Sequence, residues 1–140
     1  MAKNTQAIDF YKKALGAEEV MRFPTPDGKI MHAEIGIGDS RIMLGDEMPE
    51  QGGKGPKSIG GTPVSFFVYQ EDVDTAWQRA MDAGAREVMP LEDQFWGDRA
   101  GCFEDPFGHQ WWLAQHLRDL TPEELNKAAE SYFSQMQPAS

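Results

Sequence analysis

The chain has 140 residues, of which 40% are hydrophobic and 26% charged, and it carries a formal net charge of −10. This composition fits one globular domain and excludes a nucleic-acid partner, because 13 Lys and Arg spread among 23 Asp and Glu form no basic surface. No apolar run is long enough to cross a membrane and Met1–Gln6 lacks the apolar core of a signal peptide, so we expect a cytoplasmic protein without a membrane partner.

The first half of the chain begins with a helical pattern. Apolar residues recur at spacings of three and four up to Gly16, where a glycine can take the left-handed conformation that ends a helix. We expect Asn4 or Thr5 to cap the start of this helix. Three runs of strand-forming residues follow, separated by turn residues: Glu19–Phe23, Lys29–Ile37 and Ser40–Leu44.

The second half repeats this order. Gly16–Met21 reads Gly-Ala-Glu-Glu-Val-Met and Gly84–Met89 reads Gly-Ala-Arg-Glu-Val-Met, and a helical pattern precedes each. The predicted elements of the second half are a strand, a helix and three strands: Pro63–Tyr69, Val73–Met81, Glu87–Leu91, Gly101–Glu104 and Gln110–Gln115. The order is a βαβββ unit that occurs twice, which defines an α+β class, and the first unit lacks the strand before its helix.

A glycine-rich segment and a capped helix complete the chain. The glycines of Gly52–Gly61 predict a linker. Thr121 at the N-cap, Pro122 at the first helical position and Glu124 at the third predict a final helix. We therefore expect a single domain over 1–140, divided into module one at about 5–50, a linker at about 51–61, module two at about 62–118 and a C-terminal helix at about 121–136.

Two local motifs lie in the second module. Trp96-Gly97-Asp98-Arg99 precedes Asp105-Pro106-Phe107-Gly108-His109, in which Pro106 and Gly108 suit a structural turn. With the repeated βαβββ order, these motifs resemble the vicinal oxygen chelate superfamily, the glyoxalase, bleomycin resistance protein and dioxygenase fold, and most closely its PhnB-like branch. The resemblance covers roughly residues 7–134. It implies tandem modules that form a curved, cleft-bearing mixed sheet.

The resemblance also implies where a metal would lie. Enzymes of this superfamily hold a divalent ion with four side chains from four strands, and three of those positions fall here on Trp112, Met43 and Ser65. An indole, a thioether and a hydroxyl are poor ligands for such an ion, and the fourth position belongs to a strand before the first helix. Cys102 is the only cysteine, which excludes a cysteine-based zinc site. We therefore expect no metal and no cofactor.

Strand alternation assigns side chains to a cleft face or a core face. If the implied metal positions face the cleft, its lining is aromatic and polarisable. The ligand-contacting residues would be Trp112, Phe67 and Met43, with Ser65 and Gln110 as polar groups and Trp96 and Arg99 at the rim. The alternative is that Trp112 and Met43 only fill a core. The opposite faces would pack under the helices, with Val64, Phe66, Val68, Trp111 and Leu113 in the core.

His32 and Glu34 offer a different site. They share one face of the strand Lys29–Ile37 with Ile30. A histidine with a carboxylate two residues away can act as a general base with its orienting group, or as two metal ligands. A histidine that only bonds within the sheet is the alternative. The other histidines, His109 and His116, are expected to face solvent.

Three functions are compatible with these patterns. The favoured hypothesis is a metal-free protein that sequesters a planar or cationic small molecule, as bleomycin resistance proteins do, because aromatic faces attract both and an acidic surface attracts cations. The first alternative is a metal-dependent lyase, isomerase or dioxygenase that uses His32 and Glu34. The second is a dimerising scaffold without a ligand. The patterns favour a binding protein over an enzyme without deciding between them.

The missing first strand bears on assembly. Only Met1–Gln6 precede the first helical pattern, so the edge of the first sheet is left uncovered, which proteins avoid. Either the start of the chain is shortened or a partner subunit covers the edge. We expect a homodimer.

Overall fold

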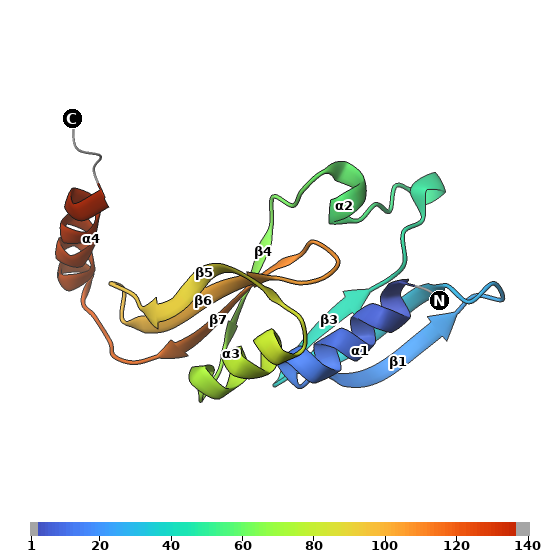
Figure 1. Ribbon diagram of the computed structural model, residues 1–140, viewed down its shortest axis with the longest axis horizontal. Helices are drawn as coiled ribbons and strands as arrows, with labels where there is room; N and C mark the ends of the chain where they lie inside the picture. Colours follow the sequence, from blue (N-terminus) through green and yellow to red (C-terminus); the bar gives the residue numbers. More distant parts are fainter. Residues whose placement is uncertain (1–2, 137–140) are drawn as a thin grey trace.

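The computed structural model describes residues 3–136 of the chain (Figure 1). Its elements are, in chain order, α1 Lys3–Leu15, β1 Glu18–Pro24, β2 Ile30–Ile37, β3 Ser40–Leu44, η1 Pro49–Gln51, α2 Pro56–Ile59, β4 Ser65–Tyr69, α3 Val73–Asp82, β5 Arg86–Asp93, β6 Asp98–Glu104, β7 Gln110–His116 and α4 Pro122–Met136. Every predicted strand is present, and the α+β order of a tandem βαβββ chain with a C-terminal helix is confirmed.

The start of α1 differs from the prediction. The helix already includes Lys3, so Asn4 and Thr5 lie inside its first turn and do not cap it. The residue that precedes Lys3 lies outside the described residues. The short helix η1 precedes the glycine-rich linker and the short helix α2 lies within it; the two helices end at Gly52 and Gly60, with φ angles of 82° and 85°.

The strands form two sheets. The first has the antiparallel order β1-β2-β3, and the second has the order β4-β7-β6-β5, in which β4 runs parallel to β7. β3 and β7 hold equivalent places in the two units, but only β7 has a strand on its far side. No strand within residues 3–136 pairs with the outer edge of β3, so this edge is uncovered, as the sequence predicts.

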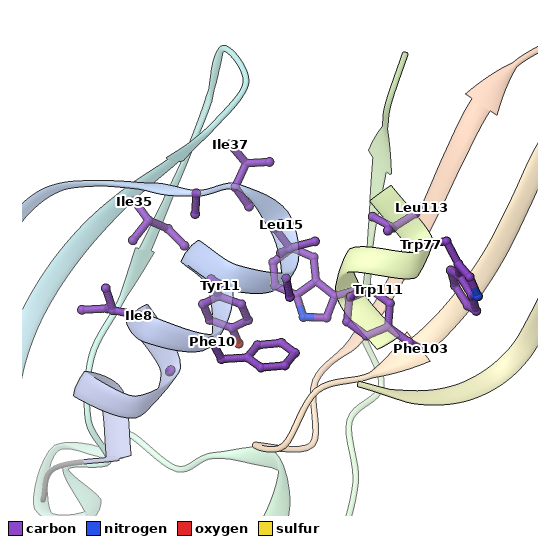
Figure 2. Close-up of a cluster of buried hydrophobic side chains, with 14 of the residues drawn as sticks. Ile8, Phe10, Tyr11, Leu15, Ile35, Ile37, Trp77, Phe103, Trp111 and Leu113 are labelled. Atoms are coloured by element: carbon purple, nitrogen blue, oxygen red, sulfur yellow. The ribbon is translucent and has the colours of Figure 1, made fainter. Parts of the chain in front are cut away.

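The two sheets share one core through their helices. α1 packs on β2, α3 packs on β7, and the two helices contact each other. Figure 2 shows Tyr11 of α1 between Ile35 of the first sheet and Trp111 of the second. Ile35 and Trp111 are both buried, with Phe103 beside Trp111. The buried cluster therefore runs from one sheet to the other.

One core prediction is wrong. Val64 is 60% exposed, because β4 begins only at the next residue and leaves Val64 outside the sheet. The other predicted core residues are buried or pack against the core: Phe66, Val68, Trp111 and Leu113.

The helix α4 lies at one end of the molecule (Figure 1). Its predicted cap is confirmed, since the Thr121 hydroxyl accepts a hydrogen bond from the backbone N–H of Glu124 at 3.2 Å. The ring of Tyr132 stacks on Phe95 with centroids 5.0 Å apart. None of the described helices is long and apolar enough to cross a membrane.

Candidate functional site

The face of the second sheet that points away from the helices carries four of the predicted ligand-binding residues. In the parallel pairing of β4 and β7, Ser65 lies opposite Gln110 and Phe67 lies opposite Trp112. The rings of Phe67 and Trp112 are stacked, with centroids 5.9 Å apart and planes 19° apart. Phe67 is 46% exposed, so this aromatic pair is accessible to a ligand. We call this surface, extended by Tyr69 of β4, the aromatic face.

The first sheet has an open face of its own. Glu34 of β2 lies opposite Met43 of β3, and the ring of His32 stacks on Phe23 of β1 at 6.1 Å. Ile30 does not share this face, contrary to the prediction. It is buried in the core, because an irregularity in the pairing of β1 with β2 between Phe23 and Pro24 shifts the strand alternation there.

The structure therefore brings the predicted residues together in two groups. Ser65, Phe67, Gln110 and Trp112 lie on the second sheet, and His32, Glu34 and Met43 on the first. Among the described residues no hydrogen bond, ion pair or ring contact joins the two groups.

Trp96 and Arg99 lie on different sides of the second sheet. The indole N–H of Trp96 donates a 2.8 Å hydrogen bond to Asp98, at the end of the aromatic face. Arg99 binds Asp74 of α3 at 3.0 Å and Asp93 of β5 at 3.1 Å. These bonds raise the pKa of Arg99, the bond to Asp74 most. Of the two residues expected at the rim, Trp96 therefore lies at the end of the aromatic face, whereas Arg99 points to the helix side.

Asp98 is a functional candidate that sequence reasoning assigned only to a family motif. It is 2% exposed. It accepts hydrogen bonds from the Tyr69 hydroxyl and the Trp96 indole, each at 2.8 Å, and lies 3.3 Å from Nδ1 of His116. The hydrogen bond to Asp98 raises the pKa of Tyr69. The sequence signal was the alternation that puts Tyr69 on one face with Ser65.

His116 ends β7 beside Asp98. Its side chain is 55% exposed, in agreement with the prediction that it faces solvent, but both ring nitrogens have partners. Nδ1 faces Asp98, and Nε2 lies 2.7 Å from Asp119. The two carboxylates raise the pKa of His116, Asp119 more than Asp98, so the imidazolium form is favoured.

A second buried carboxylate, Asp105, has a structural role. It is 3% exposed and accepts hydrogen bonds from the Tyr11 hydroxyl at 2.5 Å and the Trp111 indole at 2.9 Å. The backbone N–H groups of Phe107 and His109 also donate to it. Burial, with Asp105 close by, raises the pKa of Tyr11 well above its ordinary range. This turn thereby ties α1 to the second sheet.

The donor set does not fit a metal. Ser65 and Trp112 lie on the second sheet and Met43 on the first, and none of the three is a strong ligand for a divalent ion. His32 and Glu34 have no third ligand beside them, since no group of three or more His, Cys, Asp or Glu side chains within the described part of the chain is arranged to hold an ion.

Two grooves run along the uncovered edge of β3. The larger, of about 740 Å³, lies between β3 and β4 and is lined by Ile42, Phe67, Tyr69 and Arg79 among others. The smaller, of about 250 Å³, is lined by Met43, Tyr11 and Trp111 among others. Two residues of the aromatic face, Phe67 and Tyr69, therefore line the larger groove, whereas Trp112 lines neither.

Comparison with known proteins defines the class. The model of the Glyoxalase/Bleomycin resistance protein/Dioxygenase superfamily matches residues 5–113, so the chain belongs to this superfamily. An uncharacterised protein of Mycobacterium bovis is 49% identical over 128 residues, which are 89% of this chain and 84% of that protein. TioX of Micromonospora sp. ML1 is 28% identical, with a TM-score of 0.64 over 84% of this chain and 91% of TioX.

Two more distant structures share the fold. TnmS3, an antibiotic binding protein of Streptomyces sp. CB03234, is 22% identical with a TM-score of 0.61, over 83% of this chain and 88% of TnmS3. A PhnB protein from Bacillus cereus is 20% identical with a TM-score of 0.61, over 81% of this chain and 92% of that protein. The predicted resemblance to PhnB-like proteins thus holds at the level of the fold.

Proposed function

We propose that this chain is a metal-free binding protein that sequesters a planar small molecule on the aromatic face. The observation that carries the proposal is the stacked pair of Phe67 and Trp112, which is accessible and flanked by Ser65 and Gln110. A planar ligand gains dispersion and stacking from such rings, and a cationic one adds roughly 0.5–2 kcal/mol per ring. Membership of the Glyoxalase/Bleomycin resistance protein/Dioxygenase superfamily, and a fold shared with the antibiotic binding protein TnmS3, support this function.

The binding unit is a cytoplasmic homodimer. Each sheet exposes large apolar side chains on the face away from its helix, among them Met43 at 67% and Tyr69 at 59%. A second copy that places its first sheet over the aromatic face covers both surfaces. It also brings Met43, His32 and Glu34 opposite Trp112, which joins the two groups of predicted ligand-binding residues into one cleft.

A scaffold without a ligand is the second candidate, because the same exposed faces serve dimerisation alone. Binding of 9-aminoacridine, a planar cation, distinguishes the two. We expect it to raise the melting temperature of the protein. We expect Trp112→Ala to weaken its binding by about 1–3 kcal/mol, the range for base–aromatic stacking.

Phe133→Ala is the matched control, since Phe133 is an exposed aromatic residue on α4 whose ring contacts Phe95 and Tyr132 rather than Phe67 or Trp112. It should leave the affinity for 9-aminoacridine unchanged. Equal affinities of the wild type and the Trp112→Ala variant, or no binding by either, would leave the scaffold as the function.

A further inference from the structure

His116, at the end of β7, lies between two carboxylates, one buried and one exposed. Asp98, on Nδ1 of His116, is 2% exposed and is fixed by Tyr69 and Trp96. Asp119, on Nε2, has a side chain that is 99% exposed. The buried carboxylate therefore orients the ring, and the exposed one only occupies the nitrogen that the ring presents to solvent.

The contact with Asp119 shows that Nε2 of His116 binds a carboxylate. A carboxylate oxygen lies 2.7 Å from Nε2 of His116, a length typical of a charge-assisted hydrogen bond. Because the Asp119 side chain is 99% exposed, among the described residues little besides His116 holds it in place. Exposed ion pairs contribute little net free energy, so another carboxylate can take this position with little loss.

A chain of side-chain contacts connects the aromatic face to His116. The ring of Trp112 stacks on Phe67, and the Phe67 ring lies 5.4 Å from that of Tyr69. The Tyr69 hydroxyl in turn donates to Asp98, which holds His116. Trp112 and His116 are four residues apart on one strand, about 13 Å, a span that suits a fused polycyclic ligand.

We propose that His116 binds the carboxylate of a planar aromatic ligand that lies on the aromatic face, and that this carboxylate displaces Asp119. The inference rests on the proposed function and names the ligand as an aromatic acid. The net charge of −10 repels anions at long range, but exposed charges are screened beyond about 8 Å at physiological ionic strength. The affinity for a carboxylate therefore depends mainly on its direct contact with the imidazolium of His116.

Two probes of the same shape test the proposal: anthracene-2-carboxylate and its neutral amide, titrated by fluorescence at about pH 6, where an ordinary histidine is mostly charged. We expect the wild type to bind the carboxylate about tenfold more tightly than the amide, as suits a charge-assisted hydrogen bond. His116→Gln keeps a donor for Asp98 but removes the charge. It should abolish this preference, because the affinity for the carboxylate falls much more than the affinity for the amide.

Asp119→Asn provides the second variant, and it folds because the side chain is exposed. Removing the competing carboxylate should strengthen binding of anthracene-2-carboxylate by about threefold or more and leave the amide unaffected. Equal binding of the two probes by the wild type would overturn this inference alone, as would an unchanged preference in His116→Gln or an unchanged affinity in Asp119→Asn. Failure of both probes to bind would overturn the proposed function together with it.

Discussion

At the scale of single residues, Asp98 is a buried carboxylate that hydrogen bonds from neighbouring side chains stabilise. It is 2% exposed and receives the Tyr69 hydroxyl, the Trp96 indole and His116. Asp98→Ala leaves these donors without their shared acceptor, and we expect a loss of about 2–4 kcal/mol in the free energy of unfolding, measured with urea.

Asp119→Ala is the control for this prediction, because Asp119 contacts the same histidine from solvent. It should leave the urea midpoint unchanged. If both variants lose the same free energy of unfolding, the buried hydrogen bonds of Asp98 contribute no more to stability than the exposed contact of Asp119.

At the scale of elements, the Asp105 turn joins α1 to the second sheet. The Tyr11 hydroxyl of α1 donates to Asp105 at 2.5 Å, and Trp111 of β7 donates to the same carboxylate. Tyr11→Phe keeps the ring in the core but removes one donor to a charged group. We expect it to lower the free energy of unfolding by about 1.5–3 kcal/mol in urea denaturation.

Tyr132→Phe on α4 removes a hydroxyl from a partly exposed ring and serves as the comparison. Its unfolding free energy should equal that of the wild type. A Tyr11→Phe variant as stable as Tyr132→Phe would show that packing alone, without the hydrogen bond to Asp105, holds α1 in place.

Local patterns sufficed to predict most elements. Turn glycines such as Gly108, with a φ of 94°, mark where strands end, and apolar spacing distinguishes α1 and α3 from the strands. The misplaced residues depend on pairing between strands instead. The irregularity beside Pro24 moves Ile30 into the core, and no periodicity within β2 reveals it.

At the scale of the whole molecule, alternation correctly grouped Phe67 with Ser65 and Trp112 with Gln110. It could not place Met43 relative to Trp112, because that depends on how the two sheets sit against each other. The burial of Asp98 escaped the sequence analysis for a similar reason. A carboxylate is expected at the surface unless its partners are known, and those partners come from three separate segments.

Both sheets of a single chain expose large apolar side chains, from which we predict a homodimer. Phe23 and Met43 on the first sheet are 53% and 67% exposed, and Phe67 on the second is 46% exposed, so both sheets present large apolar side chains that a partner can cover. We expect light scattering at high micromolar concentration to give the mass of two chains. Met43→Asp, which puts a charge into the proposed interface, should shift the protein toward monomer and weaken binding of 9-aminoacridine as well.

Ile59→Asp introduces the same charge at a residue that is 58% exposed on α2 and on neither sheet face. It should remain a dimer. A wild-type monomer at high micromolar concentration would refute the composite cleft, since the two groups of residues would then have no second chain to join them. If Met43→Asp becomes monomeric and still binds 9-aminoacridine with wild-type affinity, the aromatic face of a single chain is the complete site.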